Sequence, residues 1–205
     1  MSANVATAFE PVVGRTLRQI AWSRLRKDRV AIVSMIVLVF IAFIAIFGPL
    51  ISTWIGVNPY DFNTDLLSDA GSLPLGAFGG VSLDHPLGVE PLTGRDILAR
   101  LLYGTRISLL IAVSATIITV ILGTVVGVIS GYSRGRTDTI LSRFMDITLA
   151  FPLLLVIIAM SPVIEQRLQA FGLPPGNPSR ITTLILVLSV FGWPYLARLI
   201  RGQVI

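Results

Sequence analysis

The sequence has no cysteine, a single histidine and a single lysine among its 205 residues. Without cysteine it can form neither disulfide bonds nor thiolate metal sites, and the lone His85 cannot form a histidine metal cluster. The lysine, Lys27, has no glycine-rich loop before it, which excludes a Walker-type phosphate-binding loop. We therefore expect no enzyme, metal site or cofactor site in this chain, and uphill transport would need energy from a partner.

Charge is scarce as well. Charged residues make up 13% of the chain, about half the share in an ordinary globular domain. Hydrophobic residues reach 54% and the mean hydropathy is +0.83, which indicates an integral membrane protein. The net charge of +5 comes from arginines beside apolar runs and not from a basic face with interleaved aromatics, so nucleic acid is not an expected partner.

Four nearly uncharged runs predict membrane-spanning helices at 30–51, 106–130, 146–164 and 181–197. The first two exceed the roughly 20 residues that cross a bilayer, and the last two are marginal. The runs lack the alternation of barrel strands, so the predicted fold is all-α. Pro152 and Pro194 lie inside the last two runs and predict kinks.

Four spans place both termini on one side of the membrane. Eleven of the 16 basic residues then fall on the side of the termini, in the segments 1–29, 131–145 and 198–205. Only five fall on the other side, four in 52–105 and 165–180 and the fifth, Arg106, at the adjoining end of the second run. Because lysine and arginine concentrate in cytoplasmic segments, both ends are predicted to be cytoplasmic.

The first 29 residues alternate arginines with Leu17, Ile20, Ala21 and Leu25 at helical spacing. This pattern predicts an amphipathic helix at the cytoplasmic interface, with membrane lipid as its partner. A charged flank that only sets the orientation of the first span is an equally good interpretation.

The segment 52–105 is predicted to begin as an irregular loop and to end in a short surface helix near 96–103, capped by Asp96. His85 is expected to be structural. Asp146, at the edge of the third span, is expected to be solvated or paired with Arg143. No other ionisable residue lies inside a span, which disfavours a proton pump or a charged channel filter.

The second run carries small residues at intervals of four: Ala115, Thr119, Gly123, Gly127 and Gly131. Such a stripe lets another helix approach closely. It predicts either static helix packing or a moving interface along a transport path.

A motif series then points to a known family. Residues 85–109 read HPLGVEPLTGRDILARLLYGTRISL, and further matches are FGPLI, NPYDFN, GVISGYSRGRTDTILSRFMDITLAFPLLL and WPYLARLIRGQV. From about Arg24 onward, the chain resembles the C-type permease subunits of bacterial ABC importers for dipeptides and oligopeptides.

The resemblance implies a Type I ABC importer transmembrane domain in the bacterial cytoplasmic (inner) membrane. Its implied partners are a homologous second permease, two ATP-binding subunits (or one fused ATPase) and an extracytoplasmic peptide-binding protein. ATP and magnesium would be bound by the ATPase subunits. The residues implied to face the binding protein or the gate are His85, Gly88, Gly94, Arg95, Asp96 and Arg106. Arg198 and Arg201 would lie near the ATPase.

The chain departs from the family pattern in two ways. Val89 and Glu90 replace the usual Thr-Asp before Gly-Arg-Asp, which leaves the role of Glu90 open. Family members have about six spans and a Glu-Ala-Ala coupling loop after the segment ARLIRGQ, so we expect the 205 residues to be part of a longer permease. Other solutes (a nickel chelate, glutathione or an oligosaccharide), a non-transporting membrane scaffold and a channel remain alternatives.

Overall fold

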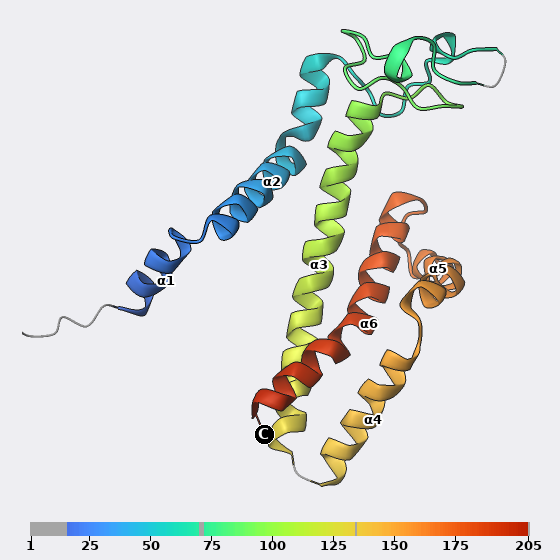
Figure 1. The fold of residues 1–205 in the computed structure, drawn as a ribbon. Helices are drawn as coiled ribbons and strands as arrows, with labels where there is room; N and C mark the ends of the chain where they lie inside the picture. Colours follow the sequence, from blue (N-terminus) through green and yellow to red (C-terminus); the bar gives the residue numbers. More distant parts are fainter. Residues whose placement is uncertain (1–15, 70–71, 134, 205) are drawn as a thin grey trace, which may run out of the picture. The chain divides into compact units, whose positions relative to one another are not determined.

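The computed structural model describes residues 16–69, 72–133 and 135–204, and these form helices joined by one long irregular segment (Figure 1). The chain divides into two compact units, one up to Phe43 and one from Ile44 onward. The α-helices are α1 (Leu17–Leu25), α2 (Arg29–Ile55), α3 (Ile97–Tyr132), α4 (Arg136–Ala150), α5 (Leu153–Ala170) and α6 (Asn177–Val204). The described residues contain no strand, only isolated bridges.

The first unit contains α1 and the start of α2. Thr16 caps α1 with a capping box: its side chain accepts the N–H of Gln19, and the Gln19 side chain accepts the N–H of Thr16. The side chains of Leu17, Ile20 and Ala21, on which the predicted amphipathic face depends, lie outside the described residues. The structure therefore leaves that face a prediction.

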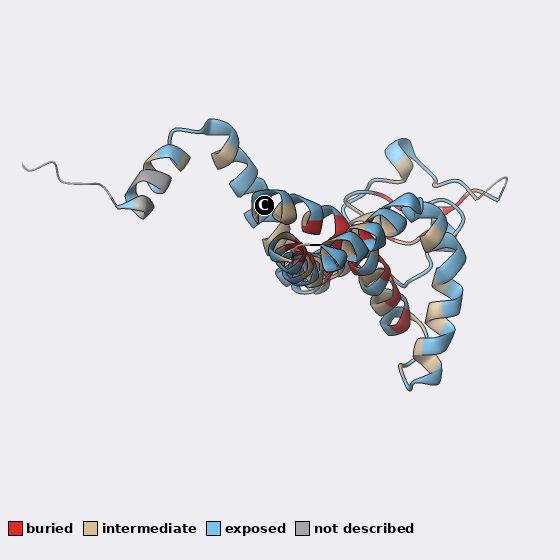
Figure 2. Ribbon diagram, turned by 90° about the horizontal axis from the view of Figure 1, so that it is seen from below, coloured by how far each residue is buried: buried red, intermediate tan, exposed pale blue. Residues whose placement is uncertain are grey.

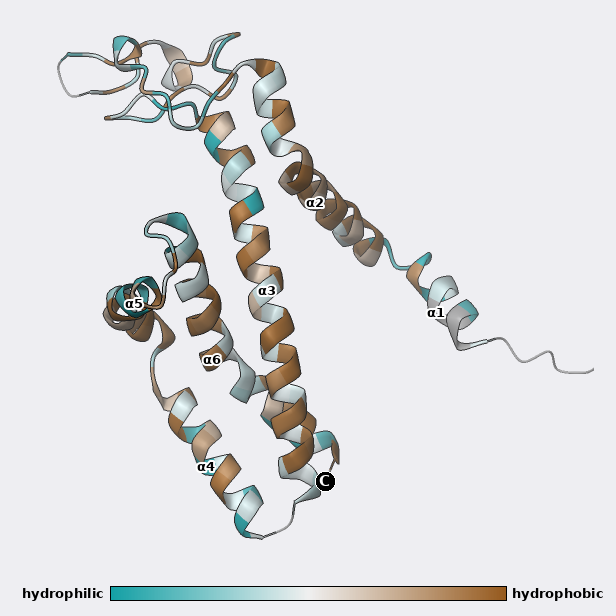
Figure 3. Ribbon diagram, turned by 180° about the vertical axis from the view of Figure 1, so that it is seen from behind, coloured by the Kyte–Doolittle hydropathy of each residue, from teal (hydrophilic) through white to brown (hydrophobic). Residues whose placement is uncertain are grey.

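Four helices are long and apolar enough to cross a membrane: α2, α3, α5 and α6. Their number matches the four predicted spans. Figure 3 shows the apolar residues along these helices and more polar residues in the segment between α2 and α3. At 1.5 Å per residue, the 27 residues of α2 and the 36 residues of α3 extend about 40 and 54 Å, both longer than the hydrocarbon core.

The separate surface helix predicted near 96–103 is wrong. Residues 97–103 are the first two turns of α3, which continues without interruption to Tyr132. Asp96 does cap this helix, as predicted. No proline interrupts the stretch that follows, so the helix propagates from the cap into the apolar run.

The third predicted span is divided. The predicted loop 131–145 is mostly helical because α4 begins at Arg136. Phe151 and Pro152 are extended (ψ 126° and 113°) between α4 and α5. Pro152 lacks an N–H and disfavours helical geometry in the residue before it, so it breaks the helix and does not merely kink it. Figures 1 and 2 show α5 running across the direction of α4.

The fourth span is longer than predicted. The predicted loop 165–180 shrinks to 171–176, because α5 reaches Ala170 and α6 begins at Asn177. The predicted terminal segment 198–205 is helical as far as Val204. Pro194 lies within α6, whose ribbon bends along its length (Figure 1).

The buried residues of the second unit lie mainly on α3 and α6, which pack against each other (Figure 2). Met145 of α4 and Trp193 and Ala197 of α6 form a small core, against which Val126 and Leu141 pack. Phe144 stacks on Trp193 with ring centroids 5.8 Å apart. Three helices thus share one interface, and α5 contributes no buried residue to it.

Candidate functional site

The segment between α2 and α3 is irregular but ordered by backbone hydrogen bonds. It contains two short 3-10 helices, Thr64–Leu66 and Ala77–Gly79. The N–H of Leu75 donates to the carbonyl of Leu66 (2.8 Å), and the N–H of Val89 donates to that of Gly79 (3.0 Å). These bonds join distant parts of the segment, so it is a folded structure and not a loose loop.

His85 and Asp96 form the centre of this segment. Asp96 is 1% exposed, and its Oδ1 accepts the N–H of Ala99 (2.7 Å) at the start of α3. Its Oδ2 lies 2.9 Å from Nδ1 of His85. The histidine thus holds the capping carboxylate in place, which fits the structural role expected for it. Among the described residues, no group of three His, Cys, Asp or Glu could hold a metal ion.

Gly88 and Gly94 allow two close backbone crossings. Both have positive φ angles, 74° and 67°. A Cβ at Gly88 would overlap the carbonyl oxygen of Gly79, and one at Gly94 would overlap that of Asn63. Asn63 also donates from its side-chain amide to the carbonyl of Gly94 (2.9 Å). Only glycine fits these two positions of the segment.

Glu90, whose role the sequence leaves open, gathers three donors. Its carboxylate accepts Nε of Arg95 (2.6 Å), the hydroxyl of Thr93 and a guanidinium nitrogen of Arg100. The guanidinium of Arg95 also lies 5.5 Å from the centre of the Phe62 ring. Glu90 therefore ties the start of α3 to the loop before it.

Arg106, the remaining predicted gate residue, is not part of this cluster. It lies ten residues along α3 from Asp96, about 15 Å away at helical rise. There it borders a shallow hollow with Ala45, Ile46 and Val113. The structure thus brings together His85, Gly88, Gly94, Arg95 and Asp96, but not Arg106.

Three non-glycine residues of the segment, Ser72, Phe78 and Leu92, have positive φ angles that the sequence does not reveal. Phe78 and Leu92 have positive φ angles of 53° and 72°, although their side chains are 94% and 75% exposed. Bulky residues rarely adopt such angles, and strain of this kind is often found at functional sites. Periodicity carries no signal for a single backbone angle, so the sequence could not reveal them.

The small-residue stripe of α3 packs against α6. A Cβ at Gly123 would lie 2.9 Å from Cβ of Leu196, one at Gly127 2.7 Å from the carbonyl oxygen of Ala197, and one at Gly131 2.7 Å from Cβ of Val204. Nearer the N-terminus of α3, the carbonyl of Ala115 accepts a hydrogen bond from the hydroxyl of Ser189 (3.4 Å), and Thr119 lies against Gly192. The stripe is a helix-packing seam in this structure.

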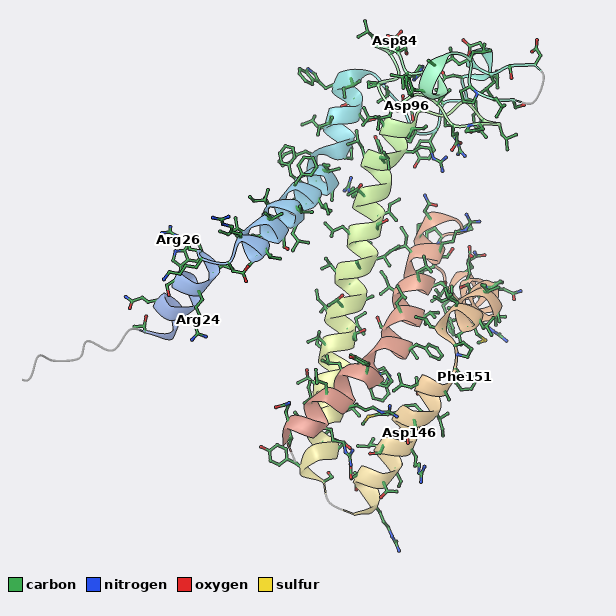
Figure 4. All side chains as sticks on the ribbon, viewed as in Figure 1. Arg24, Arg26, Asp84, Asp96, Asp146 and Phe151 are labelled. Carbon is green, nitrogen blue, oxygen red and sulfur yellow. The ribbon has the colours of Figure 1, made fainter. Side chains whose placement is uncertain are left out.

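Two ion pairs fasten α4 to α6. Arg201 donates from Nε and Nη2 to both carboxylate oxygens of Asp138 (2.6 and 2.7 Å). Asp146 pairs with Arg198 and not with Arg143, so the expected partner is wrong, but its side chain is 47% exposed and therefore solvated, as expected. Figure 4 shows Asp146 on the length of α4 that runs beside α6. A charged side chain near a membrane edge is expected to have a partner of opposite charge. The sequence cannot show that this partner is Arg198, because Arg198 lies 52 residues away on α6.

Asp138 also accepts hydrogen bonds from Ser130 of α3 (2.6 Å) and Ser142 (3.4 Å). Arg201 first, and then Ser130, lower the pKa of Asp138 from 3.8 to about 2. A lowered pKa stabilises the folded state above the unfolded value, and this contribution is lost as the pH falls through the folded value. We expect the attachment of α4 to weaken between about pH 4 and pH 2.

Hydrogen exchange of the α4 amides across this pH range tests the expectation. The wild type should lose protection in α4 as the pH falls, whereas Asp138→Asn should show low protection throughout. Ser142→Ala removes only the longest bond to Asp138 and serves as the control, with a wild-type profile. Equal protection of Asp138→Asn and the wild type at neutral pH would contradict the proposed attachment.

One catalytic-looking motif has no catalytic context. Residues 131–135 read GYSRG and fit the pattern Gly-x-Ser-x-Gly. That pattern marks a nucleophile where a strand turns into a helix, whereas Ser133 follows one helix and precedes another. The only histidine of the chain, His85, is hydrogen-bonded to Asp96. The motif therefore gives no nucleophile.

Two family models match the chain. Residues 16–74 match the N-terminal TM domain of oligopeptide transport permease C, and residues 123–205 match the binding-protein-dependent transport system inner membrane component. The chain is 36% identical over 185 residues to the oligopeptide transport system permease protein OppC of Bacillus subtilis, covering 90% of this chain and 52% of that protein.

Other relatives carry related names. The dipeptide transport system permease protein DppC of B. subtilis is 33% identical over 187 residues, 91% of this chain and 50% of that protein. The glutathione transport system permease protein GsiD of Pectobacterium atrosepticum is 29% identical over 182 residues, 89% and 52%. The chain thus spans about half the length of these curated relatives.

The family models and relatives agree with the four apolar helices and with the motif series on which the resemblance rests. The chain belongs to the family of binding-protein-dependent transport system inner membrane components and is similar to permease proteins named for oligopeptide and dipeptide transport; it is a multi-pass protein of the bacterial inner membrane with the all-α fold of a Type I importer membrane domain.

Proposed function

We propose that the chain forms part of the membrane pathway of an ATP-driven importer for dipeptides or oligopeptides. The observation that carries the proposal is the 36% identity, over 90% of the chain, to a protein named as an oligopeptide permease. The permease catalyses no chemistry itself. ATP hydrolysis occurs in two ATP-binding subunits or one fused ATPase, and a homologous second permease completes the pathway.

The arginine distribution supports a topology with both described ends in the cytoplasm. The segment around His85 and Asp96 then faces outward, where an extracytoplasmic peptide-binding protein docks. His85, Gly88, Gly94, Arg95 and Asp96 shape this surface by fixing the start of α3. Arg198 and Arg201 lie at the ATPase side and attach the end of α6 to α4.

Transport by the reconstituted whole importer tests this function. We expect labelled di- or tripeptide to accumulate in proteoliposomes only with ATP on the ATPase side and binding protein on the other side. We also expect peptide-loaded binding protein to stimulate ATP hydrolysis. An ATPase rate that stays the same with and without the permease and the binding protein would contradict the proposal and would favour a non-transporting membrane scaffold.

Glutathione is the second candidate solute, because the permease named for glutathione transport is 29% identical to this chain. A competition assay separates the two. If peptide is the solute, an excess of an unlabelled tripeptide with ordinary α-peptide bonds should abolish uptake of the labelled peptide, and an excess of glutathione should not. Uptake of labelled glutathione that is abolished by excess glutathione, but not by the same tripeptide, would assign the importer to glutathione.

A further inference from the structure

Four basic side chains lie at the junction of α1 and α2: Arg24, Arg26, Lys27 and Arg29. All four are exposed. Asp28 is the only acid between residues 16 and 43, so the junction carries a strong local positive charge. An exposed cluster of charges of one sign creates a local potential that attracts ligands of the opposite sign.

The single acid does not neutralise these bases. Oδ1 of Asp28 accepts the N–H groups of Val30 (3.0 Å) and Ala31 (3.1 Å) and thereby caps α2. Within the part of the chain that the structure describes, none of the four bases forms an ion pair with a carboxylate. Their charge is therefore available to a ligand.

The backbone of the junction is ordered. The N–H of Arg26 donates to the carbonyl of Trp22 (3.1 Å), that of Lys27 to Arg24 (3.0 Å) and that of Asp28 to Leu25 (3.2 Å). These bonds satisfy carbonyls at the end of α1 and hold the basic residues in a tight turn. Figure 4 shows Arg24 and Arg26 on opposite sides of the chain, so the two can reach separate ligand groups.

The sequence places the junction directly beside the first apolar run. An uncharged run begins at Val30, and the next charged residue is Asp61, so the hydrocarbon core begins within about two turns of the four bases. The guanidinium of Arg26 lies 5.2 Å from the centre of the Trp22 ring, which is 53% exposed. Tryptophan beside arginine is typical of the headgroup layer.

We propose that Trp22–Arg29 binds the phosphate groups of anionic phospholipids in the leaflet at the α1 end of α2. Guanidinium groups match phosphate oxygens in charge and in bidentate geometry, and Lys27 adds a point charge. The site holds α1 at the membrane surface and does more than orient the first span. It does not depend on which solute the importer carries.

Native mass spectrometry of the intact importer tests the proposal. The protein is purified in mild detergent with equimolar phosphatidylglycerol and phosphatidylcholine, and the retained lipids are counted. We expect the wild type to retain phosphatidylglycerol preferentially. The double variant Arg24→Gln/Arg26→Gln should lower this preference at least about fivefold, the effect expected for one basic residue near an anionic surface.

The matched control removes the same charge elsewhere. Arg136→Gln/Arg167→Gln changes two other exposed arginines, on α4 and α5, and should retain phosphatidylglycerol like the wild type. Equal loss in both double variants would show a response to net charge alone and would overturn the site.

Tryptophan fluorescence locates the lipid. The chain has three tryptophans, so Trp54→Phe/Trp193→Phe leaves Trp22 as its only one, within an importer whose other subunits are made tryptophan-free. Brominated phosphatidylglycerol should quench Trp22 more strongly than brominated phosphatidylcholine, and Arg26→Gln should remove the difference. Trp193 belongs to the core, but the mass measurement needs neither substitution, so it tests the site even if this variant unfolds.

Three further results would overturn the proposal. Unchanged phosphatidylglycerol retention in Arg24→Gln/Arg26→Gln would leave the bases only an orienting role. Release of bound phosphatidylglycerol by millimolar inorganic phosphate would indicate a site for soluble anions. Loss of the ATPase subunits with unchanged lipid retention would identify a protein contact.

Discussion

Gly127→Leu is expected to destabilise the packing of α3 on α6 by about 3 kcal/mol or more, near the upper end of the cost of overpacking. A Cβ at this position would lie 2.7 Å from the carbonyl oxygen of Ala197 and 3.1 Å from its Cα. Both are backbone atoms of a helix and cannot rotate away as a side chain could. The two helices must therefore separate, and in lipid no hydrophobic effect restores their association.

The control variant Gly104→Leu separates the effect of helix packing from the effect of the substitution itself. Gly104 lies in the same helix with nothing within 4 Å of a Cβ placed there. Leucine is the better helix former, so this control should be neutral or stabilising by up to about 1 kcal/mol. Unfolding of each purified variant in mixed micelles gives the two free energies. Equal stability of the two variants would show that α3 and α6 do not pack at Gly127 in solution.

Gly94→Ala is expected to unfold the segment around His85 and Asp96. The residue has φ 67°, which costs alanine about 1–2 kcal/mol, and the new Cβ would overlap the carbonyl oxygen of Asn63. With the overlap we expect a total of about 3 kcal/mol or more. Limited proteolysis of residues 60–96 should show rapid cleavage, and peptide uptake should fall because the start of α3 is no longer held.

Gly56→Ala separates strain from overlap. Gly56 has φ 87° but no atom within 4 Å of a Cβ placed there. It should therefore show only the cost of the backbone angle, about 1–2 kcal/mol. If the two variants were cleaved at the same rate, the crossing of Gly94 over Asn63 would contribute nothing to the segment.

The sequence predicts those features that depend on local composition. Uncharged length gave the number of spans, and the spacing after Asp96 gave the cap of α3. The four-residue interval of Gly123 and Gly127 indicated close helix packing. Each of these features is encoded within one helix or one turn, and so it can be predicted without knowledge of the tertiary contacts.

The errors arise at a proline inside an apolar run and where one segment depends on another. The predicted third span runs through Pro152 because both sides are apolar, yet the proline breaks the helix between α4 and α5. The partner expected for Asp146, if it has one, is its neighbour Arg143, whereas the structure pairs it with Arg198. The positive φ angle of Phe78 and the ion pairs of Glu90 arise only when the segment folds. No periodic pattern in the sequence encodes them.

The break at Phe151 and Pro152 divides the second unit mechanically. On one side, the ion pairs Asp138–Arg201 and Asp146–Arg198 attach α4 to α6. On the other side, α5 has no buried residue and is joined to α4 by two extended residues, but Glu165 of α5 accepts a hydrogen bond from Ser179 of α6 (3.2 Å) and pairs with Arg180. A change in the direction of α5 would therefore require rotation at Phe151 and Pro152 and also a rearrangement of its polar contacts with α6.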